Sequence, residues 1–252
     1  MRAVVRAVPT SFANALCANP PPEPIYLGAA RAQHTLYCTA LLECGVKLIR
    51  VPADEDHPDC CFVEDTAVVV GNRALITRPG APTRRGEVRA IAIALEHSGL
   101  DVLQMTEPAT LDGGDCMRVG KTIFVGKSAR TNAAAIARLA EVFPELWIVP
   151  IDLPPHVLHL KCVVSPLGGD RVLLADGTLD PKRFSHPVII PAEETYAANC
   201  VSVGDHAIVA DGFPRTLEAI RKAGLSPHPV PTSEVRKADG SLTCQSILLD
   251  VG

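Results

Sequence analysis

The chain has 252 residues, of which 47% are hydrophobic and 21% are charged, and its formal net charge is −4. This is a globular composition, and the length permits one large domain or two small ones. Because acidic and basic residues are interspersed, the charge pattern argues against a nucleic-acid surface and a polybasic membrane patch. It fits a small polar ligand better.

The N-terminal apolar run is broken by Arg6 and is followed by no cleavage site of small residues, so we expect no secretory signal. No stretch approaches the roughly 18 apolar residues that a membrane span needs. The nine cysteines cannot all pair, and without an export signal we expect reduced thiols in a cytoplasmic protein. The scattered Cys and His residues do not exclude zinc ligation, but they give no positive case for a structural site.

Five copies of one unit follow one another at spacings of about 40 to 50 residues, which is typical of closed or stacked arrays. Each copy is expected to form a strand, a Gly- or Asn-containing turn, a second strand, an amphipathic helix and a third strand. The chain opens inside a split copy, with a strand at 3–8, a helix at 30–44 and a strand at 47–51. The next copy has strands at 62–70, 74–77 and 101–105 and a helix at 85–97, and the one after it has strands at 115–119, 122–125 and 147–150 and a helix at 132–142. The following copy has strands at 160–164, 171–175 and 188–190 and a truncated helix at 180–184. The last complete stretch has strands at 199–203 and 206–209 and a helix at 214–223. The strand at 243–249 completes the split copy.

Pairing of the two terminal strands would close the array and remove its sheet edges. The leading ends of the first strands would then face one another across a central cavity. The residues at these ends are Asp65, Asp115, Lys161, Asn199, Cys200 and Cys244. We therefore predict a closed α/β array that forms a single domain over residues 1–252. An α/β sandwich with polar strand ends in solvent is the alternative, and it does not explain the split copy.

Cys244 is flanked by hydroxyl and amide side chains, whereas an inert buried thiol usually has aliphatic neighbours. Lone cysteines at strand ends are common, so the case for a nucleophile depends on His159 and on the acidic turn that holds Asp112. A nucleophile, a base and a group that orients the base form the logic of a Cys-His-carboxylate hydrolase. On the residues alone, a lone histidine in an apolar segment such as that of His159 is more often a core residue than a catalyst.

Several motifs, in the same order along the chain, resemble the dimethylarginine dimethylaminohydrolase family. They are Phe62-Val63-Glu64-Asp65, residues 75–85, Leu111-Asp112-Gly113-Gly114-Asp115, Arg130-Thr131-Asn132, Leu158-His159-Leu160-Lys161 and Leu242-Thr243-Cys244. The resemblance spans residues 3–244. It implies the pentein fold, a five-bladed pseudo-symmetric α/β propeller of ββαβ repeats around a central active-site cavity. It also implies hydrolysis of dimethylarginine and monomethylarginine to citrulline and a methylamine through a covalent thiouronium, with no cofactor and no metal.

The resemblance makes Cys244 the nucleophile, His159 the proton carrier and Asp112 the group that orients the imidazole. Asp115 is assigned a structural role in capping the turn. A planar, cationic guanidinium needs fixed carboxylates, which Asp59, Glu64 and Asp65 would supply. Two adjacent buried acids are costly without a cation, and we expect the substrate guanidinium to be that cation.

Arg84 and Arg130 match the family positions that bind the substrate α-carboxylate, for which bidentate pairing is the physical reason. The alternatives are a surface charge for Arg84 and capping of backbone carbonyls for Arg130. Leu16 and Ala238 match positions whose backbone contacts the substrate amino group, and residues 14–25 are expected to form a lid. Gln245 stands where relatives often carry a second cysteine, so regulation by a neighbouring thiol is not carried over.

Two other functions stay open at this point. An arginine deiminase shares the chemistry and releases ammonia, but such enzymes usually carry an additional helical domain for which this chain has no room. A pentein that binds without catalysis is disfavoured by the joint presence of Cys244, His159 and Asp112. The expected partner is a small-molecule substrate, with no nucleic acid and no membrane, and a homodimer is left open.

Overall fold

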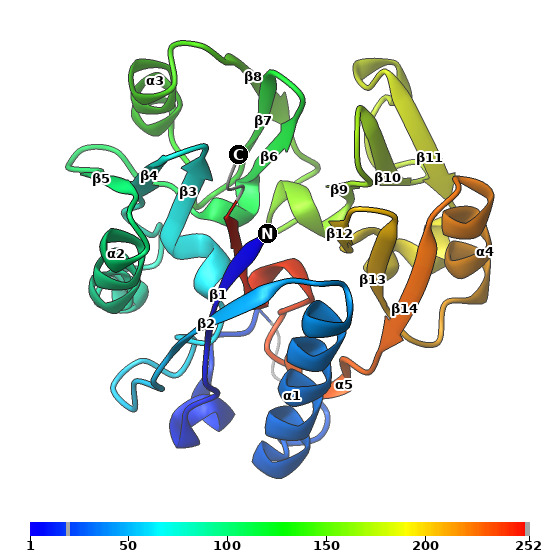
Figure 1. The fold of residues 1–252 in the computed structure, drawn as a ribbon, viewed down its shortest axis with the longest axis horizontal. Helices are drawn as coiled ribbons and strands as arrows, with labels where there is room; N and C mark the ends of the chain where they lie inside the picture. Colours follow the sequence, from blue (N-terminus) through cyan, green and yellow to red (C-terminus); the bar gives the residue numbers. More distant parts are fainter. Residues whose placement is uncertain (19–20, 250–252) are drawn as a thin grey trace.

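A computed structural model describes residues 1–18 and 21–249, which form five separate three-stranded sheets arranged around one axis (Figure 1). In each sheet the first strand is antiparallel to the middle strand, and the third strand is parallel to it. A parallel pair needs a crossover connection, which places a helix outside four of the five sheets. The five-bladed α/β fold is confirmed, and the sandwich alternative is wrong.

The terminal blade joins both ends of the chain. Its middle strand β1 (Arg2–Arg6) pairs with β15 (Ile247–Leu249) and with β2 (Lys47–Val51), and Arg2 lies opposite Leu249. The other blades are β3 (Ala67–Val70), β4 (Arg73–Ile76) and β5 (Asp101–Gln104); β6 (Cys116–Val119), β7 (Thr122–Lys127) and β8 (Trp147–Asp152); β9 (Val164–Pro166), β10 (Arg171–Ala175) and β11 (His186–Ile190); and β12 (Val201–Val203), β13 (His206–Ala210) and β14 (Ser226–Val230). The split copy is therefore one blade, as the sequence predicts.

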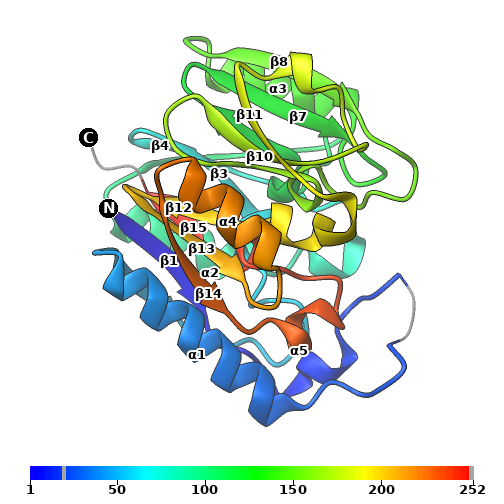
Figure 2. The ribbon, with the colours of Figure 1, turned by 90° about the vertical axis from the view of Figure 1, so that its right-hand side faces the viewer.

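The crossover helices are α1 (Leu27–Glu43), α2 (Val88–His97), α3 (Ala133–Val142) and α4 (Pro214–Lys222). The blade of β9 to β11 has only the 3₁₀ turn Pro181–Arg183 in this place, which agrees with the truncated helix predicted there. The short helix α5 (Ser233–Arg236) precedes β15 in the chain, and α1 runs alongside β14 (Figure 2). Within the described residues, every helix is too short or too polar to cross a bilayer.

Apolar side chains close the ring, because each junction between neighbouring blades is filled by its own buried cluster. Representative members from the two sides of each junction are Val4 and Ile76, Leu75 and Val125, Met117 and Val172, Leu173 and Val209, and Ile208 and Val5. Burial of apolar area is the main favourable term in folding. The propeller is thus held together by hydrophobic packing between sheets whose strands pair only within their own blade, as far as the described residues show.

The first strands begin later than the sequence predicts, because a 3₁₀ turn precedes the strand in each blade. Four of these turns are Val63–Thr66, Gly113–Asp115, Leu160–Cys162 and Thr243–Gln245. The hydroxyl of Thr66 donates to the carbonyl oxygen of Val63 at 2.6 Å and so competes with strand pairing. The expected strands at 62–70, 115–119, 160–164, 199–203 and 243–249 are corrected accordingly, and their polar leading residues lie in these turns or directly after them.

Candidate active site

A cavity of about 160 Å³ is lined by residues from loops and turns that lie far apart in the sequence. It brings together eight of the residues singled out from the sequence: Leu16, Asp59, Asp65, Arg84, Arg130, His159, Ala238 and Cys244. Asp112 does not line the cavity but contacts His159, which does. Glu64 does not line the cavity either. Carboxylates, a histidine, a thiol and two arginines therefore share one small space, although they come from distant parts of the chain.

Cys244 occupies the middle of the turn Thr243–Gln245 and is partly exposed, rather than standing at the head of a strand. Burial, together with the charges of Glu64 and Asp65, holds the pKa of this thiol well above its usual range. The resting group is therefore a thiol at neutral pH. A cation that entered the cavity would favour the thiolate.

The imidazole of His159 and the carboxylate of Asp112 form a buried pair, with 3.1 Å between His159 Nε2 and Asp112 Oδ2. Asp112 is held in turn by the backbone N–H of Gly80, which donates to Oδ1 at 2.8 Å. Burial lowers the pKa of His159, but Asp65, the hydrogen bond to Asp112, and Asp115 outweigh that effect and raise the pKa to about 9. His159 is therefore an imidazolium at neutral pH, with Nδ1 left for proton transfer.

Two glycines let the acidic turn approach the site closely. A Cβ on Gly113 would lie 2.0 Å from the carbonyl oxygen of Glu64, and one on Gly114 would lie 2.8 Å from His159 Nδ1. The N–H of Gly114 donates to Asp65 Oδ1 at 2.9 Å. Any side chain here would displace the residues that the turn positions.

The carboxylate of Asp115 is held by three neighbouring groups of the chain, which is the arrangement of a structural residue. Its Oδ2 accepts from the hydroxyls of Ser128 and Thr131, and its Oδ1 accepts from the N–H of Leu160 at 3.0 Å. These contacts fix the backbone directly after His159. The turn-capping role assigned to Asp115 agrees with this geometry.

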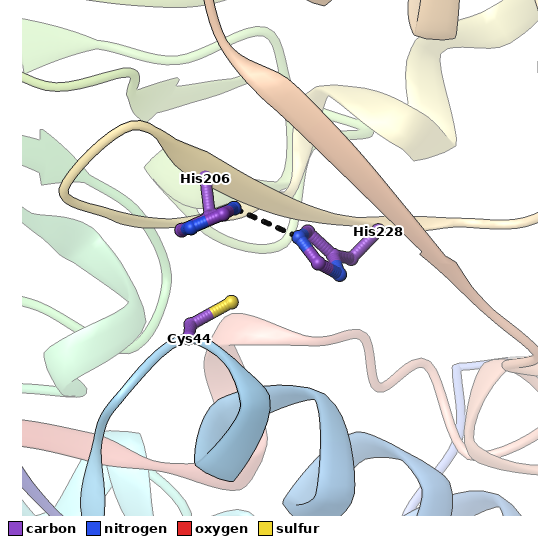
Figure 3. Close-up of side chains that lie close together, drawn as sticks. All are labelled: Cys44, His206 and His228. Carbon is purple, nitrogen blue, oxygen red and sulfur yellow. Dashed lines mark hydrogen bonds between the residues drawn. The ribbon is translucent and has the colours of Figure 1, made fainter.

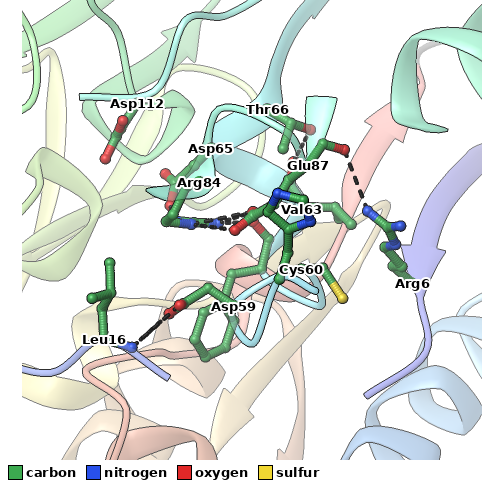
Figure 4. Close-up of polar contacts among 12 residues, drawn as sticks. Arg6, Leu16, Asp59, Cys60, Val63, Asp65, Thr66, Arg84, Glu87 and Asp112 are labelled. Carbon is green, nitrogen blue, oxygen red and sulfur yellow. Dashed lines mark hydrogen bonds and ion pairs between the residues drawn. The ribbon is translucent and has the colours of Figure 1, made fainter. Parts of the chain in front are cut away.

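Arg84 is buried, so the surface-charge alternative is wrong (Figure 4). Its Nη1 donates to Asp65 Oδ2 at 2.5 Å, and its Nε and Nη2 donate to the carboxylate of Glu87 at 2.8 to 3.2 Å. The sequence reasoning did not single out Glu87. The available signal was its spacing three residues after Arg84 in a turn, which suits an ion pair.

Arg130 is the less restrained arginine of the cavity. Its guanidinium lies 3.8 Å from the carboxylate of Asp112. The exposed fraction of the side chain is 27% for Arg130 and 6% for Arg84. A ligand carboxylate can therefore reach Arg130 without displacing a short ion pair.

Glu64 and Asp65 line two different cavities. The Oε1 of Glu64 accepts from Lys161 Nζ at 2.6 Å and its Oε2 accepts from the hydroxyl of Thr243 at 2.7 Å. Glu64 lines a second cavity, of about 210 Å³, whose lining includes residues of the first strand of every blade. The expectation that a substrate cation compensates both acids needs correction, because Lys161 pairs with Glu64 and Arg84 pairs with Asp65.

The segment predicted as a lid borders the cavity through Leu16, Cys17 and Ala18. The N–H of Leu16 donates to both oxygens of Asp59 at 3.1 and 3.2 Å (Figure 4), and the N–H of Ala18 donates to Asp239 Oδ2 at 2.5 Å. Residues 19 and 20 of the predicted lid lie outside the described residues. Asp59 is thus engaged by the lid backbone, and burial raises the pKa of its carboxyl.

Comparison with known proteins gives consistent results. A family model for eukaryotic N,N dimethylarginine dimethylhydrolase matches residues 10–191. The N(G),N(G)-dimethylarginine dimethylaminohydrolases of Pseudomonas aeruginosa and Streptomyces coelicolor are each 36% identical, covering 86% and 98% of this chain and 87% and 96% of those proteins. A solved structure of the Pseudomonas aeruginosa protein, a cysteine-to-serine mutant complexed with citrulline, matches with a TM-score of 0.92 at 34% identity and covers 98% of both chains.

A five-bladed α/β propeller with a cysteine, a histidine and carboxylates gathered in one cavity defines a pentein of the guanidine-modifying class. Within that class, the chain belongs to the dimethylarginine dimethylaminohydrolase family.

Proposed function

We propose that this protein hydrolyses Nω-methylated arginines to citrulline and a methylamine, with Cys244 as the nucleophile. The observation that carries the proposal is that Cys244, the His159–Asp112 pair and Asp65 converge on one cavity whose walls also hold two arginines. That set of charges complements a ligand with a cationic guanidinium at one end and an amino-acid group at the other. Family membership supports the same reaction.

Substrate binding prepares the nucleophile. The guanidinium approaches Asp65 and brings a positive charge next to Cys244, whose pKa is raised by burial, Glu64 and Asp65. The added charge favours loss of the thiol proton to solvent. The thiolate then adds to the central guanidinium carbon.

His159 handles the protons of the two following steps. As an imidazolium it gives its proton to the leaving nitrogen, so that methylamine or dimethylamine departs as the C–N bond breaks and a thiouronium remains on Cys244. The neutral imidazole then takes a proton from the water that attacks this adduct. Breakage of the C–S bond releases citrulline and restores the thiol, and Asp112 keeps the imidazole oriented throughout.

The amino-acid end of the substrate is assigned to the lid side of the cavity. Arg130 pairs with the α-carboxylate, and Arg84 adds a contact through Nη1 while Glu87 keeps hold of its other nitrogens. Asp59 is assigned to the guanidinium from the sequence, but both of its oxygens accept from the N–H of Leu16, so we place it at the α-amino group together with the backbone of Leu16 and Ala238. Glu64 acts only through its charge, because it lines the other cavity.

A citrulline assay with dimethylarginine, monomethylarginine and arginine as separate substrates tests this function. We expect turnover of the methylated substrates, loss of that turnover in Cys244→Ser, and little reaction with arginine. A preference for unmethylated arginine would indicate a deiminase instead, and no turnover of any of the three would support a binding protein. We also propose a cytoplasmic location, supported by the nine cysteines, which are all free thiols.

A further inference from the structure

A cysteine and two histidines meet at the junction between the terminal blade and the blade of β12 to β14 (Figure 3). Cys44 follows the last residue of α1, His206 opens β13 and His228 lies in β14. Their Sγ and ring nitrogen atoms all lie within 4.8 Å of one another, and all three side chains are half-buried. None of them lines the cavity of Cys244.

The strand register brings the two imidazoles together. His206 is paired with Ser226 in the parallel ladder, and His228 lies two residues farther along β14. Because side chains alternate along a strand, both imidazoles project from the same face of the sheet. One imidazole donates to the other, with 2.9 Å between His206 Nδ1 and His228 Nε2, and the ring centroids are 4.8 Å apart.

The thiol reaches this face because α1 packs against it. Ile208 and Val230, each two residues beyond one of the histidines on the same face, share an apolar cluster with Leu41 of α1. Cys44 packs against the same cluster from the end of the helix. Apolar packing thus fixes the three groups near one another before any ion is considered.

We propose that Cys44, His206 and His228 form a zinc site that links α1 to the neighbouring blade. A thiolate with two imidazoles is a ligand set that Zn²⁺ prefers. Ligand atoms around a tetrahedral zinc lie about 3.3 Å apart for two nitrogens and about 3.5 Å apart for sulfur and nitrogen, from bond lengths of about 2.0 and 2.3 Å. The two ring nitrogens, now 2.9 Å apart, therefore need to move apart by only a few tenths of an ångström, and the sulfur, which lies within 4.8 Å of both, needs to approach them by about 1.3 Å at most.

The local charge also favours a cation. Cys44 stands at the C-terminal end of a helix of 17 residues, where the backbone carbonyls carry partial negative charge, and no basic residue occupies the last turn. Glu43 adds its negative charge to the surroundings of Cys44. Water can complete the coordination at the fourth position, because the cluster is half-exposed.

Every proton that zinc displaces from a ligand atom has a place to go. The Cys44 thiol releases its proton to solvent and forms the Zn–S bond. The proton shared by the two imidazoles moves to the free nitrogen of the same ring, so that His206 Nδ1 and His228 Nε2 both present lone pairs to the ion. No oxidation or reduction is involved.

Titration of the whole metal-free protein with Co²⁺, followed by competition with Zn²⁺, tests the proposal. We expect one four-coordinate cobalt per chain with a thiolate-to-metal charge-transfer band, displaced by zinc. Cys44→Ser should remove the band, and His206→Gln or His228→Gln should weaken binding by about 100-fold or more. Two matched controls, Cys244→Ser for the thiol and the exposed His186→Gln for the imidazole, should leave the band unchanged.

Loss of the band in Cys244→Ser instead of Cys44→Ser would overturn the proposal, because the ion would then belong to the catalytic cavity. Absence of any cobalt–thiolate band in the wild type would also overturn it. A measurement on the wild type alone avoids dependence on the folding of the variants: zinc should slow alkylation of Cys44 in a peptide-resolved experiment. Equal alkylation of Cys44 with and without zinc would mean that the three side chains form only a hydrogen-bonded pair beside an inert thiol.

Discussion

Asp112→Asn tests the assignment of Asp112 as the group that orients His159, because it keeps the shape of the side chain and removes its charge. Asp112 uses one oxygen for the N–H of Gly80 and the other for His159. A carboxamide has one acceptor oxygen, and if Gly80 retains it, the NH₂ group faces His159 Nε2 and selects the imidazole form that accepts there. The lost charge-assisted hydrogen bond is worth about 1.5–3 kcal/mol, or roughly 10- to 150-fold in rate.

The change of tautomer adds to this loss. The corresponding Asp-to-Asn replacement in a Ser-His-Asp triad lowers kcat by about 10⁴ for that reason. We therefore expect kcat for citrulline formation to fall between about 10²- and 10⁴-fold in Asp112→Asn. The alkaline limb of the pH profile of kcat/KM, set by the pKa of about 9 for His159, should also move to lower pH, because the imidazolium has lost its partner.

A matched control separates catalysis from folding. Glu194 is another buried carboxylate, and it accepts from the N–H and the hydroxyl of Thr216, both at 2.7 Å, outside the cavity wall. Glu194→Gln should lower the thermal midpoint and leave kcat nearly unchanged. If Asp112→Asn kept its kcat within about threefold of the wild type and its alkaline limb did not move, the role assigned to Asp112 would be wrong.

Four further outcomes follow from the site. Cys244→Ser should retain the fold by circular dichroism and less than a few per cent of citrulline production, because a hydroxyl needs a stronger base than a thiol does. Arg130→Ala should raise KM strongly for substrates with a free carboxylate, and this penalty should nearly vanish for an amide analogue; an equal penalty on both would make Arg130 structural. Asp65→Asn should lower both kcat and kcat/KM on either substrate. The same variant should speed alkylation of Cys244 by iodoacetamide at neutral pH, because one of the charges that raise the pKa of the thiol is gone. Unchanged alkylation would contradict this reasoning. The pKa of His159 is raised from 6.5 to about 9, so the contribution of its protonation to the free energy of unfolding is complete below pH 6.5 and is lost as pH rises through 9. The free energies of unfolding of the wild type and His159→Gln, measured by urea denaturation, should therefore converge over that range. A difference that stays constant with pH would refute the raised pKa.

Much of the fold could be predicted from the sequence because its repeats carry their own local pattern. Each copy changes from short apolar strands to an amphipathic helix and back, so the number of blades and the shared terminal blade follow from periodicity and turn residues. The starts of the first strands could not be predicted in the same way. The run from Val63 to Val70 ends in the apolar, strand-forming residues Ala67 to Val70, and the hydrogen bond from the Thr66 hydroxyl to the carbonyl of Val63 belongs to the turn with which the run begins.

The site was predictable where residue type decides the role and unpredictable where tertiary partners decide it. Cys244, His159 and Asp112 form a chemical set that few other functions need, and the motifs placed them in order. The spacing of Glu87 three residues after Arg84 suits an ion pair, but it does not show that Glu87, rather than a ligand, takes two of the nitrogens of Arg84. Such partners are set by packing between a turn and the helix that follows it.

The division of labour between Glu64 and Asp65 follows from the turn that holds them. Successive side chains in a 3₁₀ turn point about 120° apart, since it has 3.0 residues per turn, whereas in a strand they would point to opposite faces. Glu64 therefore reaches Lys161 and lines the second cavity, of about 210 Å³, whereas Asp65 lines the cavity of Cys244. Both charges still act on the thiol. Lys161 neutralises Glu64 at 2.6 Å, whereas Asp65 pairs with Arg84 and interacts electrostatically with His159. In the reaction that we propose, an incoming guanidinium competes for this same carboxylate, and the competition links substrate binding to ionisation of Cys244.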